Sequence, residues 1–171
     1  PCSADVAYLD NDGSYIYYTS AEVSPIENHL FRVRVRGRSI SKPQRITHEP
    51  GWHNIDLSPD CSKFIDRYSS LNVPGVTVVK KTDGTVINKI LTAIDPLDEY
   101  AQCEVELGSV RSADGKFDNY YRLYYPRDFD PSKKYPMIVY VYGGPHSQMV
   151  NNSWLGNVRM WEMLMAQKGY V

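Results

Sequence analysis

The chain has 171 residues, which is enough for one domain or for parts of two. Its 19 Lys and Arg residues nearly balance its 20 Asp and Glu residues, so the net charge of -1 gives no electrostatic basis for binding nucleic acid or an acidic membrane. A membrane helix needs about 20 consecutive apolar residues, and no stretch of the chain approaches that length. The first residues lack the charged and apolar regions of a signal peptide.

The cysteines and histidines do not have the spacing of a metal site. The three cysteines are far apart in the sequence, and the four histidines form no H-E-x-x-H pattern. We therefore predict no metal and no other cofactor. The cysteine spacing leaves both the disulfide state and the redox compartment open.

Eight short strand-like segments with turn signals between them fill the first half of the chain. Many of the 14 tyrosines lie in such alternating segments, where tyrosine suits a half-exposed sheet. The segments cover residues 5–10, 14–20, 29–35, 44–48, 54–58, 62–70, 75–81 and 85–91.

The second half of this region repeats the first. When LDNDGSYIYY is placed over LSPDCSKFID, the matched pairs are Asp12 with Asp60, Ser14 with Ser62 and Ile16 with Phe64. The offset is 48 residues (60 minus 12) with four strands in each unit, which is typical of β-propeller blades, although other all-β arrays remain open. Because a closed propeller has about 4 to 8 blades, we expect residues 1–94 to be two four-stranded antiparallel blades of a larger ring.

The composition changes after Leu91, where an acidic, proline-containing linker begins. Two longer strands, 103–111 and 118–126, are joined by an Asp-Gly turn. The run 137–142 is apolar at successive positions and predicts a central strand covered on both faces. The expected fold is therefore mainly β with a short α/β part.

A helix is predicted after this strand, within residues 157–170. Its apolar positions Val158, Trp161, Leu164 and Met165 have helical spacing, and Gly169 marks its end. A further apolar strand begins at the last two residues.

Two stretches, KKYPMIVYVYGGPHSQ (133–148) and MAQKGYV (165–171), follow the blade-like repeats and resemble the dipeptidyl peptidase IV branch of the prolyl oligopeptidase family. The resemblance implies that residues 1–94 are the last two blades of a propeller. Residues 95–171 would then be a linker and the first strands and helix of an α/β-hydrolase domain, truncated before its nucleophile.

Members of that family are serine exopeptidases that release di- or tripeptides from peptide N-termini after proline. The implied partner is a peptide with proline near its N-terminus, and the implied location is the periplasm or surface of a bacterium. The sequence contains no G-x-S-x-G, and the Ser, Asp and His of the family would follow later in the chain. We therefore expect this chain to be inactive alone.

The resemblance assigns one catalytic residue and the turn beside it. Tyr142 matches the family's tyrosine whose hydroxyl donates a hydrogen bond to the oxyanion of the tetrahedral intermediate. Gly143 and Gly144 would let the backbone turn tightly and leave room for substrate, and Pro145 would stiffen the turn. Without the resemblance, Tyr142 would be interpreted as the packed end of a core strand.

Other chemistry-bearing residues are predicted to be structural. His146 and Ser147 are adjacent, whereas a catalytic triad is assembled from separated loops. The segment Gly37–Ser39 matches the first part of the G-x-S-x-G pattern of a serine nucleophile. The remaining candidates are the acidic Asp98 and Glu99, the histidines His29, His48 and His53, and the tryptophans Trp52 and Trp154. We expect them to lie in turns, on solvated faces or in ordinary packing.

A second function remains open, which is a non-catalytic β-propeller-like interaction module with a purely structural turn at 142–148. In that case the isolated chain would have an incomplete parallel sheet with an exposed edge strand. We therefore expect copies of the chain to pair into a homo-oligomer.

Overall fold

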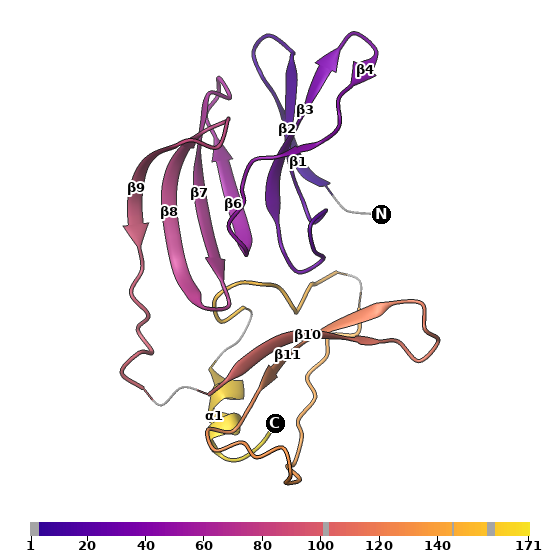
Figure 1. Ribbon diagram of the computed structural model, residues 1–171, viewed down its shortest axis with the longest axis vertical. Helices are drawn as coiled ribbons and strands as arrows, with labels where there is room; N and C mark the ends of the chain where they lie inside the picture. The colour runs from indigo at the N-terminus through magenta and orange to yellow at the C-terminus, as the bar shows by residue number, and fades with distance from the viewer. Residues whose placement is uncertain (1–3, 101–102, 145, 157–159) are drawn as a thin grey trace. The chain divides into compact units, whose positions relative to one another are not determined.

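The computed structural model describes residues 4–100, 103–144, 146–156 and 160–171, with the side chains of 4–7 left out (Figure 1). The chain forms two compact units. The first unit contains the residues up to Ile94 together with Asn151–Trp154, and the second contains Asp95–Val150 and Leu155–Val171. We describe each unit separately.

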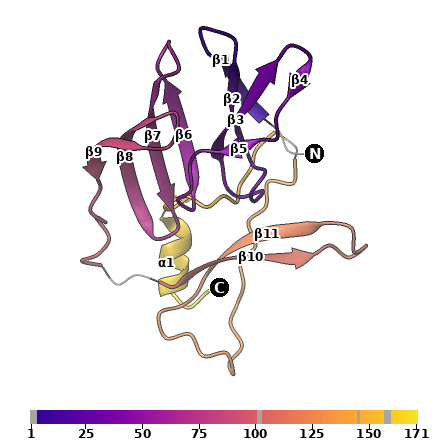
Figure 2. The same cartoon turned by 45° about the horizontal axis from the view of Figure 1, so that its top comes forward.

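The first sheet of unit 1 is antiparallel and has five strands. They are β1 (Ala4–Leu9), β2 (Tyr15–Ser20), β3 (His29–Arg36), β4 (Ser39–Ile40) and β5 (Gln44–Arg45). Both β4 and β5 pair with β3 (Figure 2). The expected fourth strand, 44–48, is shortened to β5, and β4 was not predicted. Pro43 lies in the gap between them and has no N–H to donate to the sheet.

The second sheet has four antiparallel strands in the order of the sequence. They are β6 (Trp52–Leu57), β7 (Lys63–Ser70), β8 (Val73–Lys81) and β9 (Val86–Thr92). This sheet confirms the prediction of a four-stranded antiparallel unit. A parallel bridge pairs Asn28, which directly precedes β3, with Trp52 of β6.

The internal repeat is visible in the turns before β2 and β7. The carboxylate of Asp12 accepts a hydrogen bond from the backbone N of Ser14 at 3.0 Å, and Asp60 accepts one from Ser62 at 3.1 Å. Between each pair stands a residue with positive φ, Gly13 at 70° in one turn and Cys61 at 51° in the other. The same Asx turn therefore starts the second strand of each sheet.

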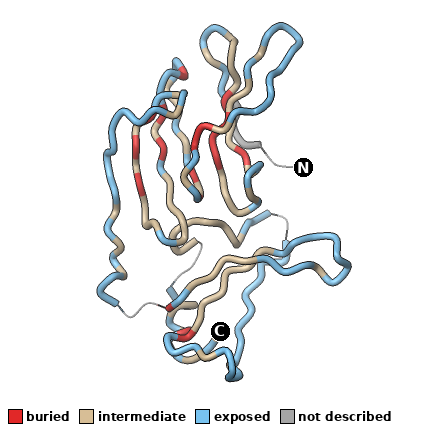
Figure 3. The backbone as a smooth tube through the Cα atoms, viewed as in Figure 1, coloured by how far each residue is buried: buried red, intermediate tan, exposed pale blue. Residues whose placement is uncertain are grey.

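The core of unit 1 is built from buried residues in and beside both sheets, which Figure 3 marks in red along the backbone. It contains Tyr17, Leu30, Ile46, Cys61 and Phe64. Phe64 is only 1% exposed. It therefore contributes close to the full hydrophobic free energy of a buried aromatic side chain.

The described residues of unit 2 form a hairpin and one helix. The hairpin strands β10 (Val105–Arg111) and β11 (Asp118–Tyr124) pair in continuous antiparallel register. The helix α1 (Trp161–Gln167) begins after Met160, whose φ of 60° is left-handed, and the predicted helix position Val158 lies outside the described residues. None of the described helices is long and apolar enough to span a membrane.

The helix ends where the sequence predicts. Gly169 has φ 92°, and its N–H donates to the carbonyl of Ala166 at 3.0 Å. The N–H of Tyr170 donates to the carbonyl of Met165 at 3.1 Å, which completes a Schellman motif. Gly169 is confirmed as the helix stop.

The prediction of a strand buried on both faces at 137–142 is wrong for this structure. No strand is assigned there, and its side chains are exposed, from 40% at Ile138 to 72% at Val139. Among the described residues, its backbone pairs with Val171, which accepts from Ile138 at 2.8 Å and donates to Pro136 at 3.0 Å. The apolar composition of 137–142 indicates that this segment is suited to burial. Pairing with the single residue Val171 is not enough to cover its side chains.

The buried aromatic of unit 1 provides a stability test. Phe64→Ala should reduce the free energy of unfolding of unit 1 by about 3–5 kcal/mol, because it removes buried contacts and leaves a cavity. Guanidinium unfolding followed by circular dichroism measures this change. The control Val86→Ala, at a side chain that is 53% exposed, should change it by less than about 0.5 kcal/mol. Equal effects of the two substitutions would contradict the assigned core.

Candidate functional site

The turn predicted to carry the chemistry has a specific local geometry. Gly143 has φ 66°, a left-handed conformation that side chains rarely adopt. A Cβ atom on Gly144 would lie 2.9 Å from Cε1 of Tyr142, so the tyrosine ring occupies the space that a side chain at 144 would need. Pro145 lies outside the described residues. The two glycines therefore allow the turn and the position of the phenol ring, for different reasons.

Tyr142 itself is 48% exposed. A phenol O–H is a hydrogen-bond donor, and its ring is held against the backbone of Gly144. The arrangement can present a donor to a molecule from solvent. The catalytic role of Tyr142 stays a prediction at this point.

The residues after the turn make local contacts. The hydroxyl of Ser147 donates to Sδ of Met149 at 3.6 Å, and Nε2 of Gln148 donates to the carbonyl of Val150 at 3.0 Å. His146 is exposed. These contacts join residues that are two positions apart, so they order the chain only locally. The interpretation of His146 and Ser147 as non-catalytic remains a prediction.

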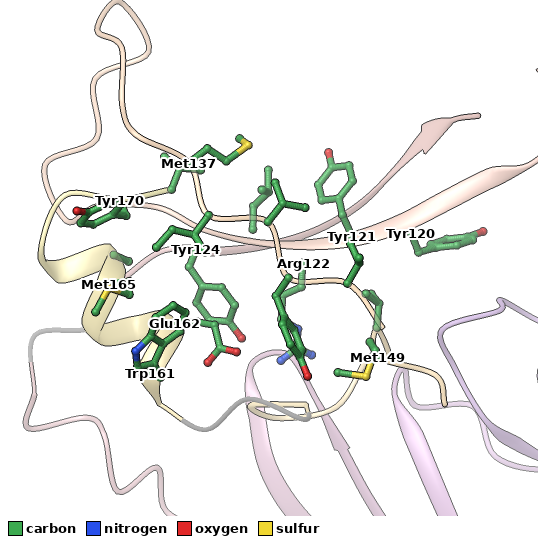
Figure 4. A pocket seen from close by; sticks show the side chains of 18 residues that line it. Tyr120, Tyr121, Arg122, Tyr124, Met137, Met149, Trp161, Glu162, Met165 and Tyr170 are labelled. Carbon is green, nitrogen blue, oxygen red and sulfur yellow. The ribbon is translucent and has the colours of Figure 1, made fainter. Parts of the chain in front are cut away.

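A cavity of about 270 Å³ lies within unit 2, between β11, the segment 137–141 and α1 (Figure 4). Its walls are mainly apolar, with side chains such as Met137, Met165 and Tyr170 around it. One carboxylate oxygen of Glu162, Oε2, is buried there without a hydrogen-bond partner. An extended segment facing a helix is the arrangement of a protein interior, so we assign this space to packing and not to a ligand.

Unit 1 contains a buried charged cluster that the sequence interpretation missed. The carboxylate of Asp66 is fully buried, and its two oxygens have different partners. Oδ1 lies 2.8 Å from Nδ1 of His53, and Oδ2 accepts from Nζ of Lys80 at 3.1 Å. Lys80 also donates to both carboxylate oxygens of Glu49, at 3.2 and 3.0 Å. The cluster joins three neighbouring strands, β6, β7 and β8.

A second histidine extends this cluster toward the first sheet. The ring of His29 lies 4.9 Å from the ring of His53, centroid to centroid. His29 is fully buried, with Nδ1 3.1 Å from Oγ1 of Thr47 and Nε2 3.0 Å from Oε2 of Glu27. The other oxygen of Glu27 accepts from Nδ2 of Asn152 at 2.8 Å. A continuous set of polar side chains therefore runs from Lys80 to Asn152.

The electrostatics of the cluster follow from burial and pairing. Burial lowers the pKa of His29 because it disfavours the imidazolium, and this outweighs the opposing effect of the hydrogen bond that His29 donates to Glu27. Burial would raise the pKa of Glu27, but the hydrogen bonds from His29 and Asn152 bring it below its usual value. Burial would lower the pKa of Lys80, but Glu49 and Asp66 raise it. Lys80 and Glu27 are therefore held in their charged forms.

His29 and His53 were predicted to be ordinary blade histidines, and they are instead central members of a buried network. The available signal was Asp66, a charged residue at an inward position of the alternating strand KFIDRY. Its partners, however, come from other strands. In the described part of the chain, no group of three His, Cys, Asp or Glu residues has the geometry to hold a metal ion.

Comparison with known proteins agrees with this architecture. A family model described as the dipeptidyl peptidase IV (DPP IV) N-terminal region matches residues 3–75. Human dipeptidyl peptidase 8 is 33% identical over 176 residues, covering 95% of this chain and 19% of the relative. Probable dipeptidyl-aminopeptidase B of Emericella nidulans is 24% identical, covering 95% of this chain and 18% of the relative.

Two solved bacterial structures are also similar. A putative dipeptidyl aminopeptidase IV from Bacteroides ovatus has a TM-score of 0.86 and 35% identity. Porphyromonas gingivalis dipeptidyl peptidase 4 has a TM-score of 0.85 and 26% identity. Each likeness covers 99% of this chain and 24% of the solved chain. The present chain thus spans about a fifth of the length of the curated relatives, at 19% and 18%.

The buried carboxylate of Asp66 provides a second stability test. Asp66→Asn should reduce the free energy of unfolding by about 3 kcal/mol, the lower end of the range for removing one partner of a buried pair, since Lys80 keeps Glu49. The control Asp56→Asn removes a pair with Arg67 in which both side chains are more than half exposed, and should cost about 0–1 kcal/mol. Denaturant unfolding compares the two. Equal losses would show that burial of Asp66 is unimportant.

The lowered pKa of His29 predicts a pH dependence. A folded-state pKa below the unfolded value of about 6.5 means that the unfolded chain binds the proton first, so stability is full above that pH and falls as pH drops below it. The groups that set the electrostatics of His29 are Glu27, Arg45 and His53. His29→Gln should flatten the fall in unfolding free energy between pH 7 and pH 5. Identical slopes in the wild type and the variant would contradict a neutral, buried His29.

Proposed function

Because the chain belongs to the dipeptidyl peptidase IV family, we propose that it is part of a serine exopeptidase that releases di- or tripeptides from peptide N-termini after proline. The recognised substrate is a peptide with proline near its N-terminus. The catalytic Ser, Asp and His lie outside the present sequence, so this chain alone does not hydrolyse peptides. Its own contribution to the chemistry is Tyr142.

The observation that carries this proposal is the geometry of the turn at residues 142–144. Acyl transfer places negative charge on the oxygen of the scissile carbonyl, and a hydrogen-bond donor that is already in position stabilises that charge without reorganising. The positive φ of Gly143 permits the turn, and the absence of a side chain at Gly144 leaves room for the Tyr142 ring against the backbone. The hydroxyl of Tyr142 therefore serves as an oxyanion donor.

A hydrogen-bond pattern in unit 2 supports an α/β-hydrolase sheet. Val171 accepts from the N–H of Ile138 and donates to the carbonyl of Pro136, which is the bonding of a parallel pair. The helix α1 lies between the two segments in the chain. An extended segment, a helix and a second extended segment in parallel form the βαβ unit from which such sheets are built.

The proposal includes two further properties, of which the first comes from the family resemblance and the second from the uncovered sheet edge. One is a location in the periplasm or at the surface of a bacterium. The other is association of copies, which is supported by the exposed apolar side chains of Met137–Tyr142.

The oxyanion role predicts a specific kinetic change in the full-length protein. Tyr142→Phe removes only the hydroxyl, so kcat for a proline-containing peptide should fall by about 10²–10³-fold while KM changes little. The matched control is Tyr140→Phe, which removes a hydroxyl from the same segment two residues earlier and should leave both constants unchanged. Steady-state kinetics with a chromogenic peptide measures both constants.

Two results would contradict the role of Tyr142. A variant with unchanged kcat would show that its hydroxyl does not stabilise the transition state. A loss confined to KM would show that the hydroxyl binds the ground state instead.

A further inference from the structure

The two buried histidines of unit 1 have different hydrogen-bond partners, and the partners of His29 match a neutral ring. Nε2 of His29 lies 3.0 Å from Oε2 of Glu27, and Nδ1 lies 3.1 Å from Oγ1 of Thr47. That Oγ1 also accepts from the backbone N–H of Leu30 at 3.0 Å, which leaves the hydroxyl hydrogen of Thr47 for Nδ1. A neutral imidazole has one N–H and one lone pair, so His29 donates from Nε2 and accepts at Nδ1.

The ring of His53 faces two oxygens that can only accept. Nδ1 lies 2.8 Å from Oδ1 of Asp66, and Nε2 lies 2.8 Å from the backbone carbonyl oxygen of Glu49. Each nitrogen must carry a hydrogen at such a distance, because a bare nitrogen would place its lone pair against those of the oxygen. Two hydrogens on the ring make His53 an imidazolium.

The second proton of this pair belongs on His53 and not on Asp66. A protonated Asp66 could donate to Nδ1 and leave the ring neutral. However, the other oxygen of Asp66, Oδ2, accepts from Nζ of Lys80 at 3.1 Å, and an adjacent cation stabilises the carboxylate form. Asp66 is therefore the charged acceptor, and the histidine is the donor.

The charges of the network also call for a cation at this position. Among the described residues, the other charged groups of the network are the carboxylates of Asp66, Glu49 and Glu27 and the cations of Lys80 and Arg45. Without a charge on His53, three carboxylates would face two cations. Buried charges are tolerated when they are paired, and an imidazolium at 53 balances the set.

Two aromatic rings enclose the ring of His53. Tyr68 stacks on it with the ring centroids 4.8 Å apart and an interplanar angle of 24°, and His29 lies 4.9 Å away. The face of a phenol ring attracts a cation, and a neutral His29 avoids the repulsion that a second imidazolium would cause. Burial lowers the pKa of His29 most, and the charge of His53 lowers it further.

We propose that His53 is a buried imidazolium that holds the loop 46–51 to β7, and that it does so only while both ring nitrogens carry a proton. The loop connects β5 to β6. Glu49 within it is held twice, since His53 donates to its backbone carbonyl and Lys80 donates to its carboxylate. With one proton lost, the ring has one donor for two acceptors, and its contact with Glu49 or with Asp66 must break.

This arrangement makes the attachment of the loop sensitive to pH. The titratable groups that face His53 are Asp66 and Tyr68 on β7, Glu49 in the loop and His29 on β3. Its contribution to stability is fully present at low pH and is lost as pH rises through the value at which the folded protein releases the second proton. The arrangement lies within unit 1 and does not depend on the proposed function.

Neutron diffraction from crystals of the full-length protein, grown at pH 7 in heavy water, locates the protons directly. We expect deuterium on both ring nitrogens of His53. His29 is the internal control and should carry deuterium on Nε2 alone. Deuterium on one nitrogen of His53 only, or on a carboxylate oxygen of Asp66, would overturn the proposal.

Hydrogen exchange in the full-length protein tests the attachment of the loop in solution. His53→Gln should raise the exchange rate of peptides covering 46–51 by about 10-fold or more, because it removes a charged donor. The matched control is His48→Gln, the same substitution at an exposed side chain of the same loop, which should leave protection unchanged. Equal rates in the two variants, or an equal loss of protection throughout β6, β7 and β8, would overturn the local role of His53.

The pH dependence has its own readout in the same experiment. When pH is raised from 7, protection of 46–51, corrected for the intrinsic rate of exchange, should fall in the wild type and stay constant in His53→Gln. Parallel pH profiles in the two proteins would overturn the dependence on the second proton.

Discussion

The fold of unit 1 depends on the buried carboxylate of Asp66. A charge removed from water is tolerated only when it is paired and hydrogen-bonded, and Asp66 satisfies this with His53 on β6 and Lys80 on β8. A slip of one residue in the register of β7 would move Asp66 to the opposite face and leave Lys80 without one of its two partners. Apolar side chains around it tolerate approximate packing, but this carboxylate requires one register. The cluster therefore specifies the pairing of three strands more than it adds net stability.

The same requirement extends through the second histidine to the far end of the network. His29 is neutral in the folded state because burial lowers its pKa, so the charge of Glu27 remains available to the carboxamide of Asn152. One network of side chains therefore has two effects. It fixes the register of the strands at Asp66, and it binds the distant segment Asn151–Trp154 at Glu27. A change at Glu27 would affect both ends of this arrangement.

Local chemistry explains why most strands were predictable from the sequence. Asp12 and Asp60 form the same Asx turn, and alternation of apolar and polar residues marks the strands that follow. The charged cluster was not predictable in the same way, because His53, Asp66 and Lys80 become neighbours only when β6, β7 and β8 pair. His53 and Lys80, each taken alone, are consistent with ordinary surface positions. Only Asp66, placed among inward-facing residues, gave a local signal.

The apolar run at 137–142 shows a different limit of sequence interpretation. Hydrophobicity indicates that a segment stabilises the fold when it is buried, but it does not identify the chain that buries it. The turn that follows is different, because the positive φ of Gly143 and the absence of a side chain at Gly144 are local features that leave room for the ring of Tyr142 whether or not the preceding run is covered. The orientation of the phenol thus depends on its immediate neighbours, whereas its location depends on what covers the run before it. An oxyanion donor needs both, since a hydroxyl with the right direction at the wrong place stabilises no charge.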